Sequence, residues 1–125
     1  MTINISENSR PDRDIDLVDV LRVIKPHVID LIWESRSVEY FGTKGNIVHE
    51  ISDKRRQVSG EQFMQLFEGV EQTIDGYFLG YKTGEHSPCL VLQVSDGCYI
   101  DVESTDVEII DKVRQSFRGV TDIPL

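Results

Sequence analysis

The three histidines and two cysteines are the side chains best suited to chemistry in this 125-residue sequence, and none of them completes a known motif. His49-Glu50 begins like the zinc-binding helix of metalloproteases, but the second histidine is missing and the segment alternates like a strand. No serine stands in a Gly-x-Ser-x-Gly elbow, and no glycine-rich phosphate loop is present. The sequence therefore predicts no catalytic residue, no metal and no cofactor.

The two cysteines are expected to be free thiols. Cys89 and Cys98 lie on neighbouring predicted strands, with Cys98 facing the core and Cys89 the other face, which exceeds disulfide reach. Small buried thiols of this kind are typical of a reducing compartment. Residues 1–14 lack the features of a signal peptide, and Asp30 interrupts the longest apolar stretch, so we expect a cytoplasmic protein without a membrane span.

The negative charge of the chain is concentrated in its C-terminal half. Residues 1–60 carry 9 basic and 10 acidic side chains, whereas residues 61–125 carry 4 and 12, which together give the net charge of −9. Such a surface repels phosphate and attracts basic partners. The basic run Lys54-Arg55-Arg56 has no interleaved aromatic residue and is expected to be a solvated loop, so nucleic-acid binding is not predicted.

An aromatic side chain among carboxylates forms the candidate binding site. The predicted partner-binding residues are Gln93, Tyr99, Asp101, Glu103 and Asp106. Tyr99 would be the anchor of an interface, and the carboxylates would attract a basic protein. The competing interpretation is that the acids only solvate a strand face and complement a helix dipole.

The elements expected in the N-terminal half begin with one helix from Asp16, capped by Asp16 and Asp19 and kinked at Pro26. Its apolar stripe consists of Leu17, Val20, Leu21, Ile24, Val28, Leu31 and Ile32. A β-hairpin over 38–51 follows, with a glycine-containing loop at 42–46. A second helix, capped by Ser59 and Gln62, should end by about Thr73.

Three strands and a helix are expected in the C-terminal half. After a break at Asp75-Gly76, a strand over 77–81 has Tyr77, Leu79 and Tyr81 on one face. Strands over 89–94 and 98–103 form a hairpin whose three-residue loop opposes Val94 to Cys98 and Leu92 to Ile100, with Gly97 in the left-handed conformation. The last helix, capped by Thr105 and Glu108, buries Ile109, Ile110, Val113 and Phe117, and ends near Gly119 and Val120.

Residues 75–118, about a third of the chain, resemble small bacterial immunity proteins of polymorphic toxin systems. The resemblance lies in Asp75-Gly76-Tyr77-Phe78, the Asp96-Gly97 turn, the acidic strand ending Val102-Glu103-Ser104, and the helix with Asp106, Ile109, Ile110 and Phe117. It implies an inhibitor that plugs the active site of a toxin.

These observations predict a flexible arm over residues 1–14 and one α+β domain over 15–125. The domain is expected to contain an antiparallel sheet of about five strands with helices packed on one face. The expected order of its elements is α-β-β-α-β-β-β-α. We expect a non-enzymatic protein-binding module that uses its acidic C-terminal face, as an immunity or inhibitor protein would. A basic partner protein is expected, nucleic acid and membrane are not, and a homodimer stays open. The alternatives are a small-ligand-binding domain with a pocket between the kinked helix and the sheet, and an enzyme that uses His49 with carboxylates.

Overall fold

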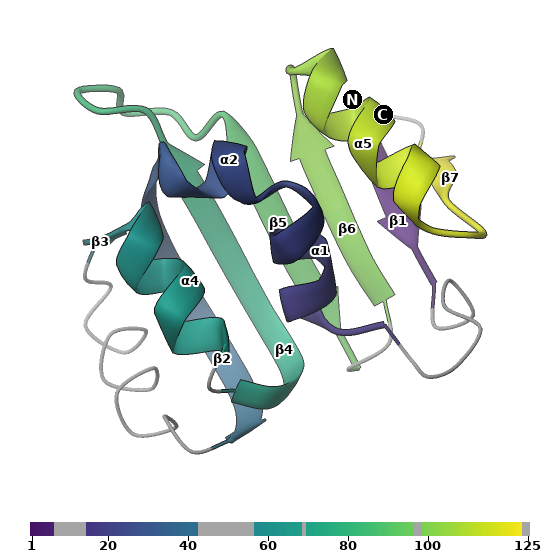
Figure 1. Ribbon diagram of the computed structural model, residues 1–125, viewed down its shortest axis with the longest axis horizontal. Helices are drawn as coiled ribbons and strands as arrows, with labels where there is room; N and C mark the ends of the chain where they lie inside the picture. The colour runs from purple at the N-terminus through teal and green to yellow at the C-terminus, as the bar shows by residue number, and fades with distance from the viewer. Residues whose placement is uncertain (7–14, 43–56, 69, 97–98, 124–125) are drawn as a thin grey trace.

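The computed structural model describes residues 1–6, 15–42, 57–68, 70–96 and 99–123. The described chain forms an antiparallel sheet of seven strands in the order β3-β2-β4-β5-β6-β1-β7. The elements are β1 (Thr2–Ile5), α1 (Leu17–Val23), α2 (Lys25–Ile29), β2 (Ile32–Gly42), β3 (Gln57–Ser59), α4 (Gly60–Glu68), β4 (Val70–Tyr81), β5 (Leu90–Ser95), β6 (Tyr99–Ser104), α5 (Val107–Ser116) and β7 (Thr121–Ile123). The four helices within the described residues lie on one face of the sheet (Figure 1). The α+β class with an antiparallel sheet is confirmed, but five strands were too few.

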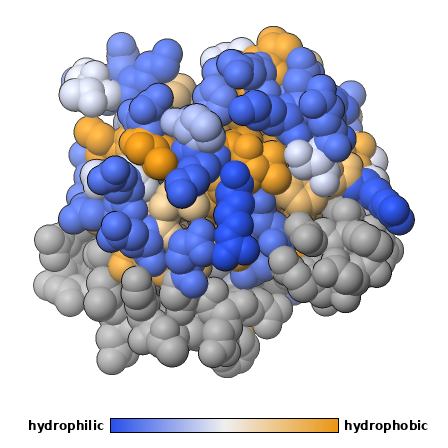
Figure 2. Space-filling model, in the orientation of Figure 1, coloured by the Kyte–Doolittle hydropathy of each residue, from blue (hydrophilic) through white to orange (hydrophobic). Residues whose placement is uncertain are grey.

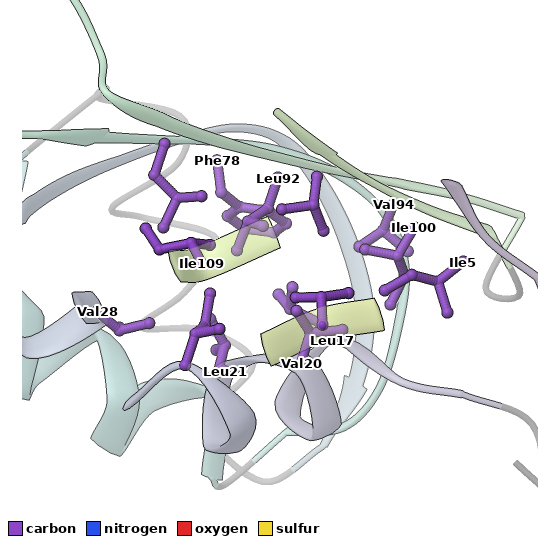
Figure 3. Close-up of a cluster of buried hydrophobic side chains, with 14 of the residues drawn as sticks. Ile5, Leu17, Val20, Leu21, Val28, Phe78, Leu92, Val94, Ile100 and Ile109 are labelled. Atoms are coloured by element: carbon purple, nitrogen blue, oxygen red, sulfur yellow. The ribbon is translucent and has the colours of Figure 1, made fainter. Parts of the chain in front are cut away.

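The apolar core fills the space between this helix layer and the sheet. Leu17, Val20, Leu21 and Val28 project from α1 and α2 toward strand residues such as Leu92 (Figure 3). Such a layer buries one stripe of each helix against one face of the sheet.

The prediction of a flexible arm over residues 1–14 is wrong for its first residues. Thr2–Ile5 forms β1, which pairs with β6 on one side and with β7 on the other. Ile3 and Ile5 are fully buried and alternate with the partly exposed Thr2 and Asn4. A four-residue alternation is too short to distinguish a strand from an arm, and long-range pairing decides the outcome. Residues 7–14 lie outside the described part of the chain.

One kinked helix was also the wrong prediction for residues 16–32. The backbone breaks at Ile24, with φ −107° and ψ 21°, and two short helices result. Pro26 lies in the first turn of α2, where a residue without an N–H donor is tolerated. Ile32 already begins β2, yet Leu17 through Val28 keep their apolar stripe on the core.

The predicted cap of the first helix is confirmed, and it also connects α1 to the sheet. The Asp16 backbone N–H donates to Asp19 Oδ2 at 2.9 Å, which is one half of a capping box. Asp16 Oδ1 accepts the backbone N–H of Thr73, in β4, at 3.0 Å. Both carboxylates are buried, at 9% and 4% exposure, where hydrogen bonds are needed to offset lost hydration.

The second predicted helix, α4, begins as expected and ends early. Ser59 Oγ accepts the Gln62 backbone N–H at 3.2 Å, and Gln62 Oε1 accepts the Ser59 backbone N–H at 3.2 Å. The helix ends at Glu68 rather than near Thr73, and Asp75-Gly76 lies inside β4 rather than in a break. Pairing of β4 along β2 explains this difference, because cross-strand contacts override local propensity. Strand residues 38–41 of the predicted hairpin lie in β2, and its loop and second strand fall outside the described residues.

The register predicted between β5 and β6 is wrong by two residues. Val94 lies opposite Ile100, and Leu92 lies opposite Val102, with Ser95 and Tyr99 as the last pair before the turn. A shift of two residues keeps every side chain on its predicted face, whereas a shift of one would exchange the faces. Asp96 takes a left-handed φ of 54°, and Gly97 and Cys98 lie outside the described residues.

The last helix buries the four expected residues but is capped differently. Asp106, rather than Thr105, is the N-cap, and its Oδ1 accepts the Glu108 backbone N–H at 2.9 Å. Ile109, Ile110, Val113 and Phe117 lie in the core. The helix ends at Ser116 with the extended residue Phe117 as its C-cap, so the predicted left-handed cap at Gly119 is wrong. Gly119 nevertheless has a left-handed φ of 65°, and Val120 packs on the core.

Trp33, in β2, contacts both α2 and α4 in this core. Its indole is fully buried and stacks on Phe63 of α4, with ring centroids 4.4 Å apart and planes 5° from parallel. Its Nε1–H donates to the carbonyl oxygen of Val28, in α2, at 2.9 Å. Gly60 starts α4 directly against the backbone of α2, where a Cβ would overlap the carbonyl oxygens of Val28 and Ile29. Helices α2 and α4 therefore approach more closely than any residue with a side chain would permit.

Gly60→Ala is expected to lower the free energy of unfolding by about 2 kcal/mol or more, because backbone atoms on both sides must move apart. Urea unfolding followed by Trp33 fluorescence measures this loss. The control is Glu61→Ala at the next, exposed residue, which should change stability by less than about 0.5 kcal/mol. Equal stability of both variants would contradict the close approach.

A surface ion pair between α1 and α4 should make stability depend weakly on pH. Arg22 Nη2 lies 2.6 Å from Glu68 Oε2, and hydrogen bonding and attraction by Arg22, with Lys25 adding to it, lower the pKa of Glu68 below its ordinary value. The folded carboxyl therefore stabilises the protein above the ordinary pKa of glutamate, and this contribution is lost as the pH falls through the lowered pKa.

Glu68→Gln should destabilise the protein at pH 7 by less than about 1 kcal/mol, since both side chains are about half exposed. The difference from wild type should be smaller at pH 3, because the carboxyl becomes protonated as the pH falls through its lowered pKa. Urea midpoints at the two pH values measure it, with Glu61→Gln on the same helix as the control. A deficit that is larger at pH 3 than at pH 7 would refute the assigned direction.

Candidate functional site

The sheet face that carries no described helix brings four of the five predicted site residues together. Gln93 lies opposite Asp101 on neighbouring strands, and Glu103 follows Asp101 two residues along β6 on the same face. Tyr99 precedes Asp101 by two residues and is 42% exposed. We call this surface the open face; its central row, from β2 to β7, consists of Arg36, Tyr77, Gln93, Asp101, Asn4 and Thr121.

Negative charge predominates on the described part of the open face. Asp101 and Glu103 lie on β6, and Glu34 lies on β2 beside Arg36, whose Nε is 2.5 Å from Glu34 Oε2. Asp75 Oδ1 accepts the backbone N–H of Asp96 at 3.1 Å, next to the turn between β5 and β6. The arginine is already paired, so the carboxylates of β6 dominate the field above their end of the sheet.

Asp101 is held in place by a residue that sequence reasoning did not include. Asn4 Nδ2 donates to Asp101 Oδ1 at 2.7 Å across the β1–β6 pair. This bond orients one carboxylate oxygen along the sheet and fixes its side chain. Asn4 was missed because β1 itself was not predicted, and only the alternation of residues 2–5 carried a signal.

Tyr77 is the second residue that the predicted site lacked. It lies between Arg36 and Gln93 in the central row and is partly exposed. The period-two pattern of Tyr77, Leu79 and Tyr81 had placed it on one face, but not beside Gln93 of β5. Tyr77 borders two shallow hollows of the open face, of about 340 and 210 Å³; the second also contacts Val91 and Glu103.

Asp106 lies apart from the other four predicted residues. Strand β6 ends at Ser104, whose Oγ donates to the Cys89 carbonyl oxygen at 3.1 Å and accepts the Asp106 backbone N–H at 3.0 Å. The chain then turns to the helix side of the sheet, where Asp106 caps α5. Its Oδ2 is 3.9 Å from Nδ1 of His27, in α2.

A cavity of about 330 Å³ lies on the helix side, between α2 and the N-terminal end of α5. Its lining residues are His27, Asp30, Leu31, Lys82, Cys89, Ser104, Thr105, Asp106 and Ile109. In the space-filling view of this side, apolar residues reach the surface between groups of polar ones (Figure 2). The cavity lies near the pocket that the small-ligand alternative expected, but its lining includes no Phe, Tyr or Trp.

The remaining candidate groups are dispersed within the described ranges. In residues 1–6, 15–42, 57–68, 70–96 and 99–123, no three His, Cys, Asp or Glu side chains gather as metal ligands would. The Cys89 thiol is free and lies 3.6 Å from the Gly80 carbonyl oxygen. His86 is exposed in the loop between β4 and β5, whereas His49 and Lys54-Arg55-Arg56 lie outside the described residues. No helix in the described ranges is both long and apolar enough to cross a bilayer.

Comparisons of the chain with protein-family models, with curated proteins and with solved structures find no match.

Proposed function

We propose that this chain is a non-enzymatic protein-binding module that holds a basic partner protein on its open face. The observation that supports this proposal is the arrangement on β6, where the exposed ring of Tyr99 shares one face with Asp101 and Glu103. Interfaces commonly combine an aromatic anchor with charges that select the partner.

The chemistry of the partner follows from the charge of this face. A basic surface would be attracted to the β6 carboxylates before contact, and this attraction raises the association rate. The resemblance of residues 75–118 to immunity proteins of polymorphic toxin systems makes a toxin domain the class of partner that we propose. Inhibition would then follow from occupying the surface that the toxin uses for its own substrate.

Replacing both β6 carboxylates with lysine should slow association with the partner about tenfold at low salt and invert its salt dependence. The partner is first captured from the native lysate with wild-type protein, and rates are then measured with purified components by surface plasmon resonance. The control, Glu61→Lys with Asp111→Lys, changes net charge equally at exposed helix positions. If both double variants slow association equally, the effect is one of overall charge and the open face is not the interface.

Tyr99→Ala should raise the dissociation rate constant rather than lower the association rate constant. Loss of an aromatic anchor is expected to speed dissociation about tenfold while association changes little. The same binding experiment measures both rates, and urea unfolding verifies that the variant stays folded. Unchanged dissociation would remove Tyr99 from the proposed interface.

A further inference from the structure

The cavity between α2 and α5 is a second candidate site, on the helix side of the sheet, and the inference about it does not depend on the proposed function. Its floor is apolar and belongs to the core: Leu31 is 7% exposed and Ile109 is 4% exposed. The volume of about 330 Å³ falls at the lower end of the range of small-molecule sites. An occupant would therefore be small and would present an aliphatic part to these side chains.

The rim of the cavity is acidic. Asp30 and Asp106 line it from the two sides, and Glu108 lies just beyond, with Oε1 4.0 Å from Nε2 of His27. Lys82 and His27 are the basic residues among the lining side chains; Lys82 is exposed, and His27 lies between Asp106 and Glu108. The carboxylate of Asp106 is 47% exposed, and its Oδ2 approaches His27, so it reaches both solvent and cavity.

The start of α5 does not make this cavity an anion site. Ser104 Oγ already accepts the Asp106 backbone N–H, and Asp106 Oδ1 accepts that of Glu108. An incoming anion would meet carboxylates instead of these two N–H donors. The charge of the rim thus favours a cation.

We infer that this cavity binds a primary alkylammonium group, with the ammonium at the Asp30 and Asp106 carboxylates and the alkyl chain on Leu31 and Ile109. An ammonium group donates up to three hydrogen bonds and has no acceptor, which suits two carboxylates on opposite sides. The group is supplied either by a free aliphatic amine or by a lysine side chain of another protein. Both have the same chemistry at the cavity.

The test titrates the whole protein with n-butylammonium and follows the methyl signals of Ile109 and Leu31 by NMR. We expect saturable shifts with a dissociation constant on the order of millimolar, as five non-hydrogen atoms permit. Two probes of the same length, 1-butanol and butyrate, should bind at least about fivefold more weakly. Equal binding of 1-butanol would show a merely apolar hollow, and stronger binding of butyrate would show an anion site, so either result would overturn the inference.

Two substitutions of opposite expected effect sharpen this test. Asp106→Asn keeps a good N-cap for α5 but removes the charge, and should weaken n-butylammonium binding about two- to fivefold. Lys82→Gln should tighten binding by a similar factor, since it removes a like charge from the rim. Asp111→Asn, on an exposed position of α5 outside the cavity, should leave binding unchanged. If Asp106→Asn and Asp111→Asn behave alike, the rim does not hold the ammonium.

A further probe identifies the source of the ammonium group. Nα-acetyl-lysine-N-methylamide carries the same ammonium and alkyl chain on a peptide unit. Binding at least as tight as that of n-butylammonium assigns the cavity to a lysine side chain, whereas binding of n-butylammonium alone assigns it to a free amine. Failure of both to bind would overturn the inference, and the open-face experiment would be unaffected.

Discussion

The rest of the fold depends on the single indole of Trp33. Its ring stacks on Phe63 while its N–H is bonded to the carbonyl of Val28, so one side chain of β2 determines the positions of α2 and α4. Gly80 of β4 lies beneath the same ring, where a Cβ would come within 3.0 Å of it. The absence of a side chain at Gly60 then allows the two helices to meet backbone to backbone. Because α2 is fixed by this contact, the wall of the cavity that contains His27 and Asp30 is fixed as well.

The two candidate sites lie on opposite sides of the sheet although their residues are close in sequence. Glu103 and Asp106 are three positions apart, but the first belongs to the open face and the second to the helix side. Ser104 lies between them, and its buried hydroxyl is hydrogen-bonded to both the Cys89 carbonyl oxygen and the Asp106 backbone N–H. These two bonds hold the turn by which the chain passes from the open face to the helix side at the end of the sheet. A buried hydroxyl with two partners is costly to move, so the turn is well defined.

Sequence patterns predicted the features that are determined by interactions between residues close together in the chain. The capping boxes at Asp16 and Ser59 and the buried stripe of α5 are read from neighbouring residues and were found in the structure. The common face of Gln93, Asp101 and Glu103 was also predicted, because period-two alternation survives a register error of two residues. Three features were not predicted, because each depends on pairing or packing with distant residues. They are the strand at Thr2–Ile5, the length of β4 and the break at Ile24. Asp106 was grouped with the wrong residues for the same reason.

The pairing of β1 determines when this sheet can be completed during synthesis. Thr2 lies opposite both Glu103 and Ile123, so β1 cannot complete its pairings until β6 and β7 have been synthesised. Until then Ile3 and Ile5 have no partners in the sheet, while β2 and β4 are separated by far fewer residues. Contacts of such high sequence separation are slow to form, because the entropy of closing a long loop is lost before the contact is gained. The pairing of β1 with β6 and β7 is therefore expected to form later in folding than the pairing of β2 with β4.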